Sequence, residues 1–241
     1  MLSYINTAAF KGCTSIKNIE IPSSVKEIGE SAFEDSTSIK NVEIPPSVTR
    51  IGSSVFRGCR NLVSLKLNEG LEYIGEYFIS GTSINNIIIP STVTYAFMAL
   101  DLCDKESKDL DVVFTEGIKE IPEAICCNGN RIRSVSLPDS ITEIKSNAFS
   151  GCNIINEIKL PQKLIKIGGG AFRGCTSIKN IEIPSSVKKI GSSAFRGCRN
   201  LVSLKLNEGL ESIGYNFISG TGIDNIIIPS TVINAKGALQ V

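Results

Sequence analysis

The chain has 241 residues with a formal net charge of +1, and it contains neither His nor Trp. The balanced charge gives no general electrostatic reason to bind nucleic acid, and no apolar run approaches the length that membrane insertion needs. Without His the chain lacks the usual general base and the commonest metal ligand, so we expect no enzyme activity, no cofactor and no metal site.

The N-terminal segment Met1–Phe10 lacks a basic region followed by an apolar stretch, so it does not resemble a secretory signal. The chain begins inside a repeated phrase, since residues 9–13 read Ala-Phe-Lys-Gly-Cys and close a repeat. Neither end shows the polar capping repeat that shields the last coil of a solenoid. We therefore expect a piece of a longer array, or end-to-end self-association.

From there the sequence repeats at an interval of 23 residues, as Phe10, Phe33 and Phe56 show. Each repeat opens on Ile-x-x-Ile-x-Ile-Pro, continues with Ser-Ser-Val-x-x-Ile-Gly and closes on Ala-Phe-x-Gly-Cys. A fixed period of this length is typical of a solenoid, in which each repeat forms one coil stacked on its neighbours. The sequence predicts about ten coils, with strands starting near Ile16, Ile39, Leu62, Ile84, Leu110, Ile132, Ile155, Ile178, Leu201 and Ile223.

Three elements are expected within a coil. Ile19 and Ile21 alternate with polar residues, which predicts a half-buried strand. Pro22 ends this strand, because proline donates no backbone hydrogen bond. The Ile-Gly pair marks a turn on the other side of the coil. The Ala-Phe pair is expected in a short 3₁₀ segment that places the ring in the core.

The period fails once along the single solenoid 1–241, which we divide into regular coils at 1–96, a degenerate coil with an insertion at 97–127, and regular coils at 128–241. The stretch Met98–Asp111 is charged and unlike any other segment. On a solenoid an insertion forms a loop on one face. It is either a drifted surface loop or a binding loop, and the second hypothesis makes candidate partner-binding residues of Asp101, Asp104, Lys105, Glu106 and Lys108.

A block of coils was copied as a unit, because residues 51–93 match residues 190–232 at 37 of 43 positions. Tyr73, Tyr77 and Tyr215 lie where the two copies differ. Exposed aromatic residues in an otherwise copied surface are candidates for partner contact. Packing between coils is an equal alternative.

Two polar surfaces are further candidates. The outward strand positions carry Asn, Ser, Glu and Lys with no aromatic residue, which suits a solvated face as well as a recognition surface. Arg173 and Arg196 are expected on adjacent coils, in a basic ridge near Lys188 and Lys189. Such a ridge could meet sulfated glycans or acidic partners, or could simply be solvated.

Cysteine recurs at one repeat position, where a small, weakly polar thiol suits a tight interior corner. Parallel side-chain directions and the serine that stands in once argue against disulfides, so the sequence predicts a ladder of reduced thiols. The rungs are Cys13, Ser36, Cys59, Cys152, Cys175 and Cys198.

These linked positions resemble the leucine-rich repeats of the BspA type, also called the Treponema pallidum type. The resemblance runs from residue 9 to about 232 and weakens between Tyr95 and Cys127. It implies an α/β leucine-rich-repeat solenoid, horseshoe-like and rich in β-structure. A parallel sheet would form one face, and short strands, turns and 3₁₀ segments the other. It also implies a bacterial or protozoan protein, on the cell surface or secreted, that binds host proteins or cells.

The favoured function is therefore a non-catalytic protein-binding solenoid in adhesion or host-protein interaction. Its partner would be a host extracellular-matrix or cell-surface protein. The alternative is an intracellular scaffold or regulator, which fits the missing signal sequence, the unpaired thiols and the absence of any Asn-x-Ser/Thr site.

Overall fold

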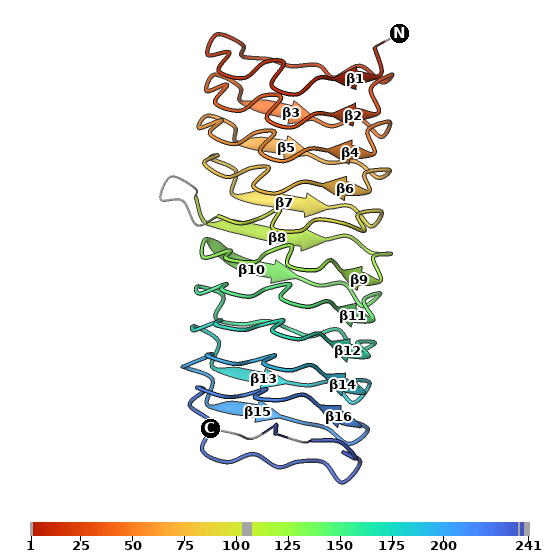
Figure 1. Cartoon of the computed structure of the whole chain (residues 1–241), viewed down its shortest axis with the longest axis vertical. Coiled ribbons are helices and arrows are strands. Elements are labelled where there is room, and N and C mark those ends of the chain that lie inside the picture. Colours follow the sequence, from red (N-terminus) through yellow and green to blue (C-terminus); the bar gives the residue numbers. More distant parts are fainter. Residues whose placement is uncertain (1, 103–107, 236, 239–241) are drawn as a thin grey trace.

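The computed structural model describes residues 2–102, 108–235 and 237–238. The coils stack in sequence order into one long column, with the first coil at one end and the last at the other (Figure 1). The predicted solenoid of parallel strands is confirmed, and the described residues contain no helix.

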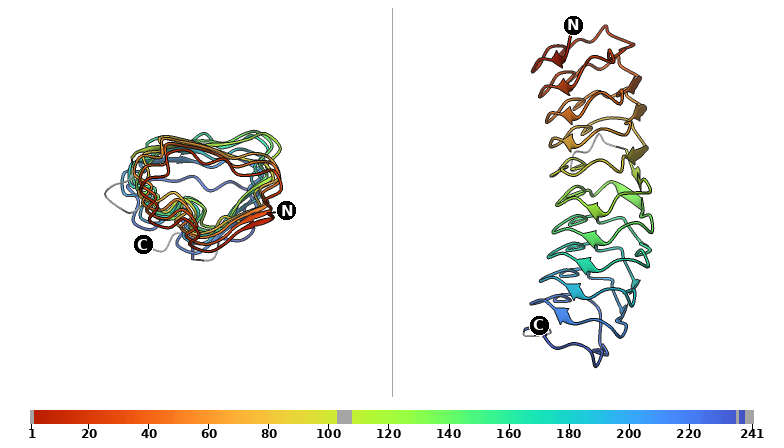
Figure 2. Two further views of the ribbon diagram at one scale, coloured as in Figure 1. Left: turned by 90° about the horizontal axis from the view of Figure 1, so that it is seen from above. Right: turned by 90° about the vertical axis from the view of Figure 1, so that its right-hand side faces the viewer.

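Two rows of parallel strands run along the column and form two of its faces (Figures 1 and 2). The short-strand face consists of β1 (Tyr4–Ile5), β2 (Glu27–Ile28), β4 (Arg50–Ile51), β6 (Tyr73–Ile74), β9 (Glu120–Ile121), β11 (Glu143–Ile144), β12 (Lys166–Ile167), β14 (Lys189–Ile190) and β16 (Ser212–Ile213). The long-strand face consists of β3 (Asn41–Glu43), β5 (Ser64–Lys66), β7 (Asn86–Ile89), β8 (Leu110–Phe114), β10 (Ile132–Ser136), β13 (Asn180–Glu182) and β15 (Ser203–Lys205).

The long strands alternate as the sequence predicts. In β13, Ile181 points into the core with 4% of its surface exposed, whereas Asn180 and Glu182 are exposed. Pairing with β15 places Ser203 beside Asn180, one repeat further along the chain. The inward residues of successive coils therefore build one continuous apolar core.

Three of the predicted long strands are not formed in the described residues. Near Ile16 only an isolated bridge joins Asn18 to Asn41, and no strand follows Ile155 or Ile223. The first and last of these segments have a neighbouring strand on one side only, which weakens a ladder. The segment after Ile155 lies within the column, and its neighbourhood is described below.

The Ala-Phe segments also differ from the prediction, because the described residues form consecutive β-turns there instead of 3₁₀ segments. Alternate backbone amides reach the next coil: those of Ser193, Phe195 and Gly197 donate to its carbonyls over 2.7–2.8 Å. The amides between them close turns within the coil, as Arg196 N does with Ser193 O at 3.1 Å. We call this third face the turn ladder.

Backbone strain is the cost of the turn ladder. Ser193 has a φ of 56° and Tyr77 also has a φ of 56°, a left-handed conformation that is unfavourable for residues with a Cβ. The amide of each such residue donates to the neighbouring coil, so an inter-coil hydrogen bond offsets the strain. The non-glycine residues concerned are Ala8, Ser31, Asp35, Ser54, Tyr77, Met98, Ala124, Asn128, Asn147, Ser193 and Asn216.

Stacked phenylalanine rings fill the core beneath the turn ladder. The ring of Phe172 lies 5.5 Å from that of Phe149 and 5.4 Å from that of Phe195, measured between centroids. Near the degenerate coil the stack changes, and Phe114 meets Phe149 edge to face at 6.5 Å and 81°. The rings of successive coils therefore lie at separations typical of stacked aromatic pairs.

Candidate functional site

The long-strand face presents a polar surface of mixed charge. Lys66 Nζ lies 2.7 Å from Glu43 Oε1, and Lys205 Nζ lies 2.6 Å from Glu182 Oε1, each pair joining adjacent coils. Hydrogen bonds from the lysines lower the pKa of both glutamates. These side chains are exposed, so the pairs order the surface and add little to stability.

The pattern of paired charges is interrupted at residues 155–160. In the described structure these residues form no backbone hydrogen bond, and Glu157 and Lys159 form no ion pair. The neighbouring strand β10 contains a β-bulge between Ile132 and Ser134, and a bulge locally disrupts a ladder. The segment after Ile155, where a strand was predicted, therefore lies beside a coil whose own ladder is irregular.

A broad hollow of about 810 Å³ covers this interruption. Its lining includes Glu157, Lys159, Asn180 and Lys205, which bring both charges and an amide to one surface. A smaller hollow of about 420 Å³ lies between β5 and β7, where Ile88 is 49% exposed. The long-strand face therefore offers two shallow depressions with free polar groups and exposed apolar surface.

The candidates in the degenerate coil lie in different surroundings. Asp101 is buried, with 2% of its surface exposed, and its Oδ2 accepts a hydrogen bond from Asn128 Nδ2 at 3.2 Å. Lys108 is exposed. Asp104, Lys105 and Glu106 lie outside the described residues.

The tyrosine candidates are not brought together. Tyr73 lies on the short-strand face, where its ring stacks on Tyr95 with centroids 4.8 Å apart and Arg50 lies 4.1 Å from its centroid. Tyr77 lies half-buried in the turn ladder. Tyr215 is 50% exposed. The sequence reasoning missed Tyr95 and Arg50, although both occupy the repeat position of Tyr73.

The two arginine candidates are exposed on adjacent rungs of the turn ladder. The predicted neighbourhood with Lys188 and Lys189 is not formed. Lys189 belongs to β14 on the short-strand face, and Lys188 Nζ lies 3.5 Å from Glu211 Oε1.

The thiol ladder is structural, as predicted. Cys198 Sγ donates to Phe172 O of the preceding coil at 3.0 Å, and Ser36 Oγ makes the same bond to Phe10 O at 2.6 Å. The described cysteines are free, and burial raises the pKa of Cys59 and Cys198 to about 12. At neutral pH such thiols are protonated and poor nucleophiles.

The described residues contain no group of three or more His, Cys, Asp or Glu side chains placed to hold a metal ion. Within the same residues, no helix has the length and apolar character required to cross a membrane. The arrangement that the chain does offer is a set of extended, rigid surfaces.

Comparison with known proteins agrees with this architecture. The family model for the BspA type leucine-rich repeat region, in six copies, matches residues 1–100 and 119–238. A leucine-rich repeat protein from Bacteroides ovatus has a similar structure, with 26% identity and a TM-score of 0.55, over 96% of this chain and 71% of that one. The pneumococcal vaccine antigen PcpA shares the fold at 21% identity and a TM-score of 0.53, over 97% of this chain and 56% of its own. Among curated proteins, none matches the sequence significantly.

Proposed function

The chain belongs to the BspA type leucine-rich repeat family, and from this premise we propose that it is a non-catalytic, protein-binding solenoid. The observation that supports this most directly is the long-strand face, where shallow depressions and free charges extend along a rigid column. Many weak contacts along such a column add up to firm binding without a deep pocket.

The contact surface we favour is the interruption at residues 155–160. Glu157 and Lys159 are exposed and have no ion-pair partner in the described structure. A partner protein can therefore pair with both charges without first breaking an ion pair within this chain. Glu43 and Lys66 both occupy the outward repeat position of Lys159, on adjacent coils, and are paired with each other. The two sites therefore form a matched comparison within one chain.

The finer proposal is adhesion at a cell surface, or as a secreted protein, to a host extracellular-matrix or cell-surface protein. Family membership supports it. Free thiols support a second candidate, an intracellular scaffold, because disulfides are rare in reducing compartments. Locating the protein in fractionated source cells decides between the two.

Two further features belong to this proposal. The degenerate coil at 97–127 would carry an additional partner loop, with Lys108 at its exposed edge. Self-association would use the end coils, where Leu2 and Phe10 line a hollow of about 330 Å³ at one end and Ile233 is 88% exposed at the other. Sedimentation of the purified chain at increasing concentration tests self-association.

The main experiment has two stages. Host-cell and matrix extracts are passed over the immobilised chain, and captured proteins are identified by mass spectrometry. The affinity of the purified partner is then measured for the wild type, for the double variant Glu157→Ala/Lys159→Ala and for the control Glu43→Ala/Lys66→Ala. A variant with residues 98–111 replaced by a regular repeat phrase is tested beside them.

If the 157/159 variant alone binds the partner more weakly, by about tenfold for two rim charges, the result supports the interruption at residues 155–160 as the contact surface. Loss only with the replaced loop moves the site to the degenerate coil. A chain that binds no host or matrix protein saturably contradicts the adhesion proposal.

A further inference from the structure

The turn ladder in the coils of Arg173 and Arg196 carries arginines without acidic partners. Arg173, Arg196 and Arg199 are exposed, and no side-chain ion pair or hydrogen bond is found for them in the described structure. Arg173 and Arg196 each follow a ring of the phenylalanine stack, whose members Phe172 and Phe195 lie 5.4 Å apart. The two guanidinium groups therefore rise from rungs that are one coil apart.

Coils nearer the N-terminus show how the same repeat positions are arranged when one of them carries an anion. There Glu34 occupies the position equivalent to Arg173, and Arg57 the position equivalent to Arg196. Glu34 Oε2 lies 2.8 Å from Lys11 Nζ, and its Oε1 lies 3.6 Å from Arg57 Nη1. A carboxylate is thus held between cations on adjacent rungs. At the equivalent position Arg173, this internal anion is replaced by a cation.

We propose that the row Arg173, Arg196 and Arg199 binds a linear sulfated polysaccharide, with a sulfate group lying between the first two side chains. This is an activity separate from protein binding on the long-strand face. Each guanidinium is a planar fork of donors that matches the oxygens of an oxyanion in pairs. A sulfate ester keeps its charge at physiological pH, so the contact does not depend on titration.

The shape of the row favours a polymer over a single small anion or a lone carboxylate. The arginines stand exposed on the turn ladder, where one ion pair is worth little. A sulfated polysaccharide carries anionic groups on successive sugar units and contacts several arginines at once, so weak contacts add. Binding should weaken with added salt, because exposed charges are screened.

The experiment uses the whole chain and an immobilised heparin fragment as the probe. Affinity is measured at low and physiological ionic strength, beside the same fragment with its sulfate groups removed and beside poly-L-glutamate. The test variant is Arg173→Glu, which installs the residue type of the equivalent position Glu34. We expect it to bind heparin at least about tenfold more weakly than the wild type.

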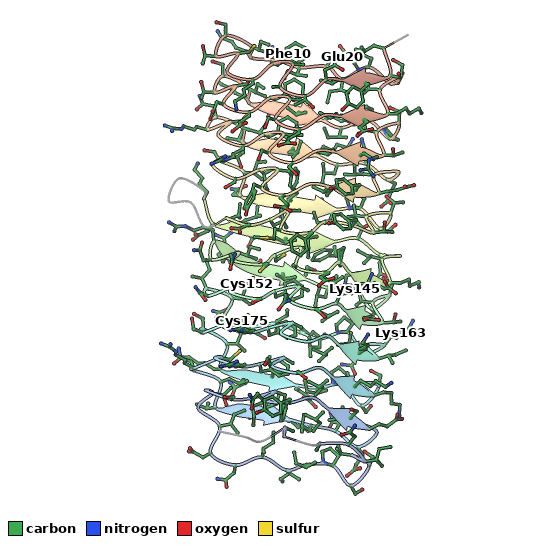
Figure 3. All side chains as sticks on the ribbon, in the orientation of Figure 1. Phe10, Glu20, Lys145, Cys152, Lys163 and Cys175 are labelled. Carbon is green, nitrogen blue, oxygen red and sulfur yellow. The ribbon has the colours of Figure 1, made fainter. Side chains whose placement is uncertain are left out.

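A charge-matched control separates this site from general attraction. Lys163 is exposed and lies at the opposite edge of the column from Cys175, which closes the coil of Arg173 (Figure 3). Lys163→Glu changes the net charge equally and should leave affinity within about twofold. The reciprocal variant Glu34→Arg should add a second row and raise the number of fragments bound per chain.

Three outcomes overturn the proposal. Equal losses in Arg173→Glu and Lys163→Glu would show attraction to net charge alone. Undiminished binding of the desulfated fragment would show that sulfate is not recognised. Poly-L-glutamate binding as tightly as heparin would reassign the row to an acidic protein. Circular dichroism of each variant excludes loss of the fold as the cause.

Discussion

At the scale of single residues, glycine determines how closely the coils approach. A Cβ on Gly191 would lie 2.4 Å from the backbone nitrogen of Gly169, whereas a Cβ on Gly169 would lie 3.4 Å from Ser192 O. Because backbone atoms cannot move aside, we expect Gly191→Ala to lower the free energy of unfolding by about 2 kcal/mol or more. Gly169→Ala should cost less than about 1 kcal/mol. Urea denaturation measures both, and equal costs would contradict the steric argument.

The thiol ladder gives a second residue-scale prediction. Burial raises the pKa of Cys198 to about 12, above its ordinary value. The thiol's contribution to stability is therefore fully present below the ordinary value and is lost as the pH rises toward the folded value. The wild type should lose stability with rising alkaline pH more steeply than Cys198→Ser, by up to about 1.4 kcal/mol per pH unit.

Serine is a fair replacement, because Ser36 donates to the carbonyl of Phe10 at the equivalent rung. Urea midpoints of the two proteins at pH values from about 8 to 11 provide the measurement. Parallel curves would mean that the thiol does not lose its proton on unfolding. Tyrosine and lysine titrate in the same range but are shared by both proteins, so they cancel in the comparison.

At the scale of elements, the interruption at residues 155–160 should be visible in amide hydrogen exchange. Amides of strand β13 are held in a ladder with β15, whereas residues 155–160 have no backbone hydrogen bond in the described structure. Backbone amides outside a hydrogen-bonded ladder exchange their hydrogens with solvent through local openings that cost less free energy. We expect amides 157–159 to exchange at least about tenfold faster than amides 181 and 183 under native conditions. Equal protection would refute the interruption.

The same interruption shows where prediction from sequence fails. The recurring phrase predicted the coils, the inward Ile and Phe residues and the thiol ladder, because each depends on side chains one repeat apart. The segment after Ile155 fits the strand pattern as well as the others do. The neighbouring coil contains a register irregularity near Arg133, and no local pattern in the segment reports such a feature of another coil.

The candidate sites were predictable to a smaller degree. The exposure of Arg173 and Arg196 on adjacent rungs follows from the period alone. Their lack of partners depends on which rungs carry carboxylates, as the pairing of Glu34 with Lys11 and Arg57 shows. The stack of Arg50, Tyr73 and Tyr95 was missed because Tyr95 follows Tyr73 by one residue fewer than the usual repeat interval of 23 residues.

At the scale of the whole molecule, each coil contacts only its neighbours, so damage to one coil should divide the column. Phe172 is fully buried between two stacked rings. Phe172→Ala should cost about 3–5 kcal/mol and let the C-terminal coils unfold before the others.

Two probes distinguish these parts in a urea titration. Circular dichroism follows the whole column, and tyrosine fluorescence follows mainly the N-terminal half, since only Tyr215 of the five tyrosines lies beyond Phe172. We expect the circular dichroism transition of the variant to begin at lower urea than the fluorescence transition. Coincident transitions in the variant would show that the column unfolds as one unit.

The turn ladder is continuous across every pair of adjacent coils, whereas both strand faces are interrupted: the short-strand face between β6 and β9, and the long-strand face on either side of the group β7, β8 and β10. The column therefore has unequal mechanical stiffness around its circumference. The turn ladder should keep its length when the column bends. The strand faces should open or close at their interruptions, where no ladder joins adjacent coils. Contact points along the long-strand face can thereby change their separation while the inter-coil hydrogen bonds of the turns stay intact.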